Sequence, residues 1–204
     1  MEVLTDPALV RERCQAWLRR NVIVGLVPTM GYLHAGHESL MRYAREQADI
    51  VVASLFVNPT QFGPTEDLAA YPRDLERDTA IARAAGVDVL FAPTPESMYA
   101  PEAATWVDVP SMGQLLCGRT RPIHFRGVCT VVAKLFLLTS PTFAVFGQKD
   151  WQQVAILRRM KTKMRDLRGK RAEVAGDGAR KQKEILRRQI NKLKKRTRRL
   201  AKAS

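Results

Sequence analysis

The sequence predicts an α/β protein with a doubly wound parallel sheet, followed by a basic helical tail. Two observations carry this prediction: apolar, β-branched runs alternate with segments of helical periodicity over short connections, and the charge balance changes after residue 160. The chain has 204 residues, of which 46% are hydrophobic and 26% charged. These values exclude a wholly disordered or fibrous chain.

The first strand is expected at residues 21–27, an apolar run that Pro28 closes. Residues 37–48 have helical spacing. A second apolar run at residues 50–57 predicts another strand, which Asn58 and the proline after it stop. These first elements already form a strand–helix–strand unit.

A polar loop then leads to a helix expected at residues 74–85 and ended by Gly86. The remaining expected elements are strands at residues 87–91, 105–109 and 142–146, and helices at residues 127–139 and 150–160. Such alternation favours a parallel sheet with helices on both faces. Ligands of these sheets bind at the carboxyl ends of the strands.

Charge divides the chain into two parts. Residues 1–160 hold 16 basic and 16 acidic residues, whereas residues 161–204 hold 18 basic and 4 acidic residues and no Trp, Tyr or Phe. The whole net charge of +14 therefore belongs to the tail. We predict a folded domain over residues 1–160 and a separate basic helical tail over residues 161–204.

The sequence shows no membrane-spanning or secretory pattern and has three cysteines. No apolar stretch approaches the length of a membrane span, and the first residues lack a basic segment followed by an apolar one. Cys14, Cys117 and Cys129 are odd in number and lack metal-ligand spacing. We therefore expect a cytoplasmic protein with reduced thiols, no membrane partner and no metal held by the protein.

One motif carries chemistry. His34 and His37 lie in Pro28-Thr-Met-Gly-Tyr-Leu-His-Ala-Gly-His37, between the first strand and the first helix, where unpaired N–H groups of a helix N-terminus can bind phosphate. Gly36 lets a phosphate approach the backbone, and the imidazoles can stabilise charge that develops on it. A simpler interpretation stays open, in which His34 is a loop residue and His37 lies on the surface.

The chain resembles the pantothenate synthetase (pantoate–β-alanine ligase) family. The resemblance covers roughly residues 1–160 and rests on five blocks in the family's order: residues 28–37, Phe56-Val-Asn-Pro-Thr-Gln-Phe62, Tyr71-Pro-Arg73, His124-Phe-Arg-Gly127 and Phe146-Gly-Gln-Lys-Asp-Trp-Gln-Gln153. It implies a Rossmann-like nucleotidyltransferase fold. It also implies an enzyme that uses ATP, with Mg²⁺ carried mainly by the nucleotide, to join pantoate to β-alanine through pantoyl adenylate. Family members are commonly homodimers.

The resemblance assigns roles to individual residues. It implies catalytic and ATP-phosphate contacts for His34 and His37, further ATP contacts for Met30, Gly147, Lys149 and Asp150, and pantoate contacts for Gln61 and Gln153. Plain alternatives stay open: Met30 as a core side chain, the glutamines as caps, and Lys149 with Asp150 as surface residues. Asn58 is a weaker pantoate candidate. Arg121, His124 and Arg126 form either a rim for anionic substrates or solvated surface.

Past residue 160 the family pattern is lost, including the Ser-Ser-Arg-Asn loop that the resemblance leads us to expect over the ATP phosphates. Three interpretations of the tail compete: a docking or coiled helix, a polycation for nucleic acid or acidic surfaces, and foreign sequence in place of the natural C-terminal half. We favour the last. The rival function is a nucleic-acid or acidic-partner binding protein that acts through residues 161–204, with strong salt dependence. Without the loop, we expect binding of substrates with slow or no turnover.

Overall fold

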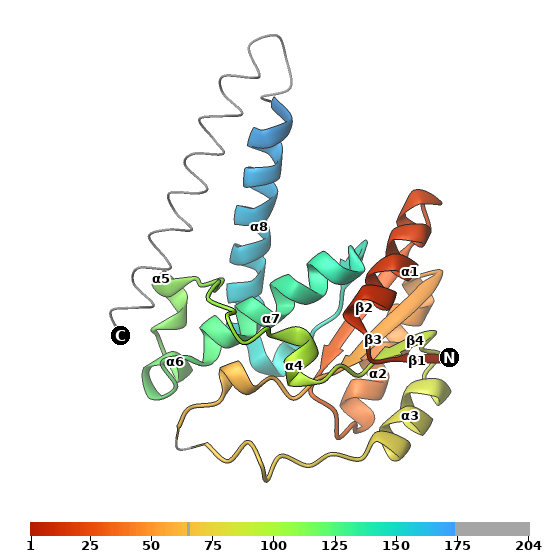
Figure 1. Cartoon of the computed structure of the whole chain (residues 1–204), viewed down its shortest axis with the longest axis horizontal. Coiled ribbons are helices and arrows are strands. Elements are labelled where there is room, and N and C mark those ends of the chain that lie inside the picture. Colours follow the sequence, from red (N-terminus) through yellow and green to blue (C-terminus); the bar gives the residue numbers. More distant parts are fainter. Residues whose placement is uncertain (65, 174–204) are drawn as a thin grey trace.

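A parallel sheet of five strands forms the centre of the molecule (Figure 1). The computed structural model describes residues 1–64 and 66–173, with side chains through residue 162. The strand order is β1-β4-β3-β2-β5 and every described pairing is parallel. The strands are β1 (Glu2–Leu4), β2 (Val24–Thr29), β3 (Ile50–Leu55), β4 (Val89–Phe91) and β5 (Phe143–Ala144).

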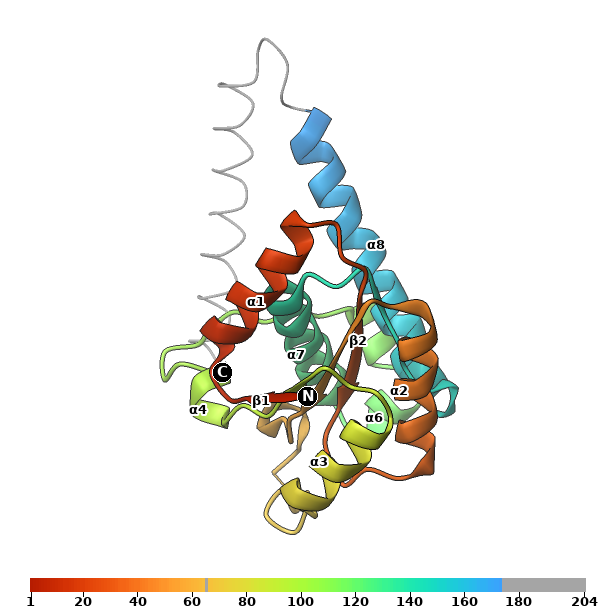
Figure 2. The same ribbon diagram turned by 90° about the vertical axis from the view of Figure 1, so that its right-hand side faces the viewer.

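Helices cover both faces of the sheet, as the sequence predicts for a doubly wound fold (Figure 2). The longer ones are α1 (Pro7–Arg19), α2 (Ala35–Gln47), α3 (Leu75–Ala84), α7 (His124–Thr139) and α8 (Trp151–Glu173). Short elements connect them: η1 (Pro59–Gln61), α4 (Pro95–Met98), α5 (Pro110–Gly113), α6 (Cys117–Thr120) and η2 (Gln148–Asp150). Helices α1 and α7 lie on one face, and α2 and α3 on the other.

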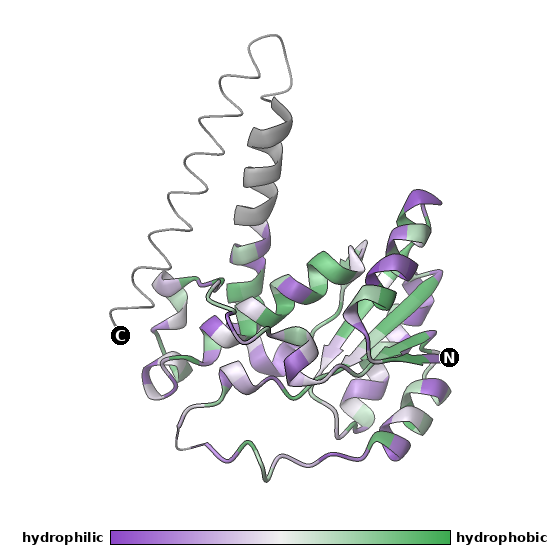
Figure 3. Cartoon of the chain, viewed as in Figure 1, coloured by the Kyte–Doolittle hydropathy of each residue, from purple (hydrophilic) through white to green (hydrophobic). Residues whose placement is uncertain are grey.

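Alternating side chains of the strands build two cores, one under each layer of helices. On β2, Val24 and Leu26 pack with α1, α7 and α8, whereas Val27 packs with α2 and α3. On β4, Phe91 packs in the first core and Leu90 in the second. This division follows because successive side chains of a strand point to opposite faces of the sheet. The strands are mainly apolar along their length, whereas the helices mix polar and apolar residues (Figure 3).

Several elements differ from the prediction. Residues 105–109 are not a strand, because the Val107 N–H bonds the Thr130 side chain of α7 at 3.1 Å instead of a neighbouring strand. The expected strand at residues 142–146 has two residues in β5. Helix α8 continues past residue 160 to Glu173 without a break, so the division at residue 160 stays a prediction. The rest of the predicted tail, residues 174–204, lies outside the described residues.

Pro28 lies inside β2 instead of ending it. Val24 and Leu26 direct their backbone hydrogen bonds toward β5, accepting from the N–H groups of Thr142 and Val145 at 2.9 Å. By the alternation of a parallel ladder, Pro28 faces the same side. The pairing with β5 has already ended there, so the missing N–H of proline costs no hydrogen bond.

None of the helices in the described part of the chain is long and apolar enough to cross a membrane.

Of the three cysteines, Cys117 is exposed and the other two are buried. Burial raises the pKa of Cys14 and Cys129 to about 12. None of these three described thiols forms a disulfide.

Candidate active site

A cavity of about 410 Å³ opens where the carboxyl ends of β2 and β3 meet one side of α7 and the first turn of α8. It lies beside the point where the strand order reverses, with β3 on one side of β2 and β5 on the other. Five of the residues predicted for ATP and pantoate binding line it: Met30, His37, Gln61, Asp150 and Gln153. Segments as far apart in the sequence as β2 and α8 thus meet at one site.

His34 caps the N-terminus of α2. Its Nδ1 accepts the Gly36 N–H at 3.0 Å, so in the neutral ring the proton sits on Nε2, which is then a donor. A Cβ on Gly36 would lie 2.8 Å from His34 Cε1, so the ring could not keep its capping position if another residue replaced glycine. The cap leaves His34 exposed with one N–H available to an anion.

His37 lies against the His34 ring, with the ring centroids 4.1 Å apart. Its Nδ1 is buried and has no hydrogen-bond partner among the described residues. Burial, and then the neighbouring His34, lower the pKa of His37, while Asp78 and Asp150 oppose the shift. The ring is therefore neutral near pH 7 in the free protein, and an anion placed beside it would favour the protonated form.

Gln61 is held rigidly at the floor of the cavity. It ends η1 and is 8% exposed, and its Nε2 lies 2.7 Å from Met30 Sδ. The neighbouring Asn58 is 1% exposed and bonds both Gln61 Oε1 and the Gly127 carbonyl at 3.2 Å. A Cβ on Gly127 would lie 2.4 Å from the Thr60 carbonyl oxygen, so this glycine allows α7 to pack directly on η1.

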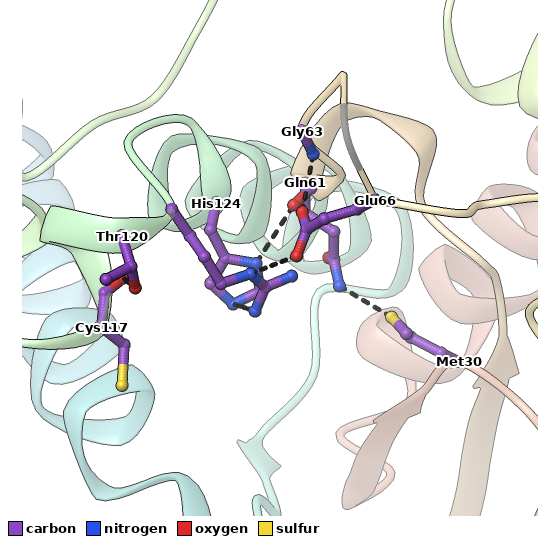
Figure 4. Close-up of polar contacts among 8 residues, drawn as sticks. Met30, Gln61, Gly63, Glu66, Cys117, Thr120 and His124 are labelled. Carbon is purple, nitrogen blue, oxygen red and sulfur yellow. Dashed lines mark hydrogen bonds and ion pairs between the residues drawn. The ribbon is translucent and has the colours of Figure 1, made fainter.

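Arg121 and His124 both line the cavity and bond to the segment that begins at Gln61, and Figure 4 shows His124 beside Gln61 and Glu66. Arg121 Nε donates to Glu66 Oε1 at 2.6 Å, and Glu66 Oε2 accepts the Gly63 N–H at 2.6 Å. These bonds, first that of Gly63, lower the pKa of Glu66. His124 Nδ1 donates to the Gln61 carbonyl at 3.1 Å, and burial lowers the pKa of its ring. Arg121 and His124 are thus part of the site, whereas Arg126 stacks on Trp106 and does not line the cavity.

Three predicted residues lie beside the cavity instead of lining it. His34 reaches it through its contact with His37. Gly147 and Lys149 belong to the segment around η2, which also carries the cavity residue Asp150. A Cβ on Gly147 would come no nearer than 4.0 Å to another side chain (Leu40), so packing alone does not demand glycine there.

Sequence reasoning missed two parts of the site. The apolar wall comes from one stripe of α7, formed by Val128, Val131, Val132 and Leu135. Its helical spacing was visible in the sequence, but not the direction in which it faces. The buried Ser54 Oγ also lines the cavity and has no partner among the described residues. A serine near the end of a buried strand gives no sequence signal of its own.

The cavity is suited to an organic anion with both polar and apolar parts. Amides and imidazoles face an aliphatic wall, and Asp150 is the one carboxylate among the lining residues. Within the described part of the chain, no three His, Cys, Asp or Glu side chains converge as metal ligands would.

Comparison with known proteins agrees with this geometry. The sequence model of the family described as pantoate-beta-alanine ligase matches residues 2–197. The chain is 71% identical over 160 residues to the pantothenate synthetase of Solidesulfovibrio magneticus, covering 78% of this chain and 56% of that protein. It is 61% identical over 167 residues to that of Nitratidesulfovibrio vulgaris strain DP4, covering 82% and 58%. The chain thus spans somewhat more than half the length of these relatives.

Solved structures share the fold. Pantothenate synthetase from Thermus thermophilus superposes with a TM-score of 0.75 at 52% identity, covering 80% of this chain and 58% of that one. The Francisella tularensis pantoate-beta-alanine ligase, complexed with beta-gamma ATP and beta-alanine, gives a TM-score of 0.76 at 34% identity, covering 80% and 63%. The predicted nucleotidyltransferase-type α/β fold is confirmed by these neighbours.

Proposed function

Because this chain belongs to the pantoate–β-alanine ligase family, we propose that its cavity binds ATP and pantoate and activates pantoate as pantoyl adenylate. A carboxylate oxygen of pantoate attacks the α-phosphorus of ATP, and pyrophosphate leaves with the electrons of the broken P–O bond. The amine of β-alanine then attacks the acyl carbon, loses a proton and displaces AMP, which gives pantothenate. The chemistry needs positioning and charge stabilisation more than a protein nucleophile.

The observation that carries this proposal is the pair of adjacent imidazoles at the N-terminus of α2, beside the cavity. His37 has a buried nitrogen without a partner among the described residues, and His34 keeps one donor available after capping the helix. Both features suit the oxygens of a polyphosphate, which would accept hydrogen bonds from both rings. Lys149 and Asp150 at the start of α8 would extend the ATP site toward the nucleotide's remaining phosphate and ribose groups, with Gly147 and Met30 against the nucleotide.

Pantoate would occupy the inner part of the cavity. Gln61 and Gln153 offer amides for its hydroxyl groups and carboxylate, and the stripe of α7 gives an aliphatic surface for its dimethyl group. The lining residues include one carboxylate, so Mg²⁺ would be held chiefly by the ATP phosphates and would neutralise their charge there. Family membership is also the ground for proposing a homodimer that works in the cytoplasm.

Pantoate-dependent exchange of labelled pyrophosphate into ATP tests the first half-reaction with the full chain. We expect His37→Ala to lower any exchange by about 10²–10³-fold, the usual loss for one group that stabilises transition-state charge. Tyr43→Ala is the matched control, because Tyr43 lies on the same helix with its side chain 55% exposed. Equal exchange in the His37 variant and the wild type would refute the assignment.

Calorimetric titration with ATP and with pantoate separates binding from turnover. We expect the chain to bind both ligands, because residues predicted for the ATP and pantoate sites line one cavity. Failure of the wild-type chain to bind ATP at millimolar concentration would refute the proposed function.

A further inference from the structure

We propose that Asp78 is a positioning residue for the nucleotide loop, residues 30–36, and that its carboxylate fixes this loop through two main-chain hydrogen bonds. Asp78 Oδ2 accepts the Tyr32 N–H and Asp78 Oδ1 accepts the Leu33 N–H, both at 2.7 Å. The two bonds join α3 to the loop across 46 and 45 residues of sequence. The inference rests on the proposed function only for what the loop binds.

The Asp78 carboxylate is buried, and the loop takes up its hydrogen-bonding capacity. Asp78 is 2% exposed, and a buried carboxylate must be compensated by hydrogen bonds or charge. Both of its oxygens are used by the loop, and Arg77 Nη1 lies 3.7 Å from Oδ1. Asp78 also belongs to the first turn of α3, where the helix dipole favours negative charge.

The loop needs such a restraint, because its backbone is unfavourable on its own. Gly31 and Tyr32 both have positive φ, at 87° and 51°; glycine adopts this left-handed conformation readily, whereas a residue with a side chain such as Tyr32 rarely does. This conformation directs the next two backbone N–H groups, those of Tyr32 and Leu33, toward the Asp78 carboxylate. Arg77 reinforces the arrangement from outside, with its guanidinium carbon 5.1 Å from the centre of the Tyr32 ring.

Packing restrains only part of this loop, because Leu33 is fully buried in the core under α2 and α3 whereas the residues before it border open space. Met30, Gly31 and Asp78 line a second cavity of about 200 Å³ on the α3 side of the first. A loop released from Asp78 would therefore have room to shift. The residues displaced would be those that lead into the His34 cap and the His37 ring.

Asp78 also acts on His37 through charge. Of the charged groups that influence His37, His34 lowers its pKa, whereas Asp78 and Asp150 raise it. Asp78→Asn should therefore lower the pKa of His37 further and weaken proton uptake when a phosphate binds. A merely structural role for Asp78 would not shift this titration in a folded variant.

Amide hydrogen exchange measured by NMR on the full chain is the direct test. In Asp78→Asn the amide group places an N–H₂ against one main-chain N–H, so we expect exchange at Tyr32 and Leu33 to accelerate at least about tenfold. The control is Glu76→Gln, which removes the same charge from an exposed position on the same helix. Unchanged exchange at both amides in the Asp78 variant would overturn the proposal.

A wild-type measurement covers the case in which Asp78→Asn does not fold. The Tyr32 and Leu33 amides should then exchange at least about tenfold more slowly than the Gly36 amide, whose bond to the His34 ring is exposed to solvent. Equal rates at the three amides would overturn the proposal.

ATP titration connects the loop to its ligand. Relative to the wild type and the Glu76 control, Asp78→Asn should bind ATP at least about tenfold more weakly while pantoate affinity stays the same. Equal ATP affinity in all three proteins would overturn the positioning role. If the wild type fails to bind ATP while the amides respond as expected, the proposed function fails and the role of Asp78 in the loop stands.

Discussion

Gly127→Ala tests the contact that holds the floor of the cavity. Alanine is normally the better residue inside a helix, by about 1 kcal/mol. Here the added Cβ would lie 2.4 Å from the Thr60 carbonyl oxygen and 2.6 Å from Gln61 Cα. An ordinary contact needs about 3.4 Å, so α7 and η1 would have to separate by roughly 1 Å.

We expect this separation to lower the free energy of unfolding by about 2 kcal/mol, in the range typical of overpacked cores. For a domain of this size the melting temperature would fall by roughly 4–8 °C. Gln61 would move with η1, so pantoate should bind about tenfold more weakly in a calorimetric titration, while ATP affinity changes little.

Gly63→Ala is the matched control for this experiment. It adds the same methyl group to the loop after η1, where the nearest atom is Glu66 Oε2 at 3.5 Å. A Gly127→Ala protein that melts at or above the wild-type temperature and binds pantoate normally would refute the reasoning.

Three further predictions concern ionisable groups. At pH 8, iodoacetamide should label Cys117 and spare the two buried thiols, which mass spectrometry of the digested protein would reveal; their labelling in the folded chain would contradict the assigned burial. Because the folded-state pKa of Glu66 is lowered, its bonds to Gly63 and Arg121 add stability above the usual pKa of 4.5 that is lost as the pH falls through the folded value. Thermal melts should therefore show E66Q to be less stable than the wild type at pH 7, with the difference shrinking below pH 4.5, and a constant difference would count against this linkage. Because the pKa of His37 is lowered in the free protein, ATP should bind with proton uptake near pH 6.5, seen as a dependence of the binding enthalpy on buffer that H37A abolishes.

The sequence predicted the parts of the fold that depend on local patterns. The buried strands at residues 24–29 and 50–55 are apolar and β-branched along their length, and Asp74 and Gly86 mark the two ends of α3. Residues 105–109 have similar composition but form no strand, because a strand exists only where a neighbour offers a ladder. The Thr130 side chain on α7 offers their backbone a partner instead.

Local patterns identify only the site residues that are joined in one motif, whereas the family resemblance was needed to connect Gln61, Asp150 and Gln153 to the same site. The loop around His34 and His37 is visible as one motif, and the structure places it beside the cavity. The role of the Asp78 carboxylate could not be predicted from the sequence, since a single acidic residue in a helix has many possible roles. Its bonds to residues 32 and 33 depend on how α3 packs against the sheet.

Pro28 helps to keep the cavity open between β2 and β5. A residue with an N–H at that position would carry a donor facing the gap between β2 and β5. The hydrogen-bonded ladder between these strands could then extend across the opening of the cavity. Proline lacks that N–H, so the hydrogen-bonded ladder with β5 is not extended past Leu26, and Pro28 and Phe146 instead line the cavity.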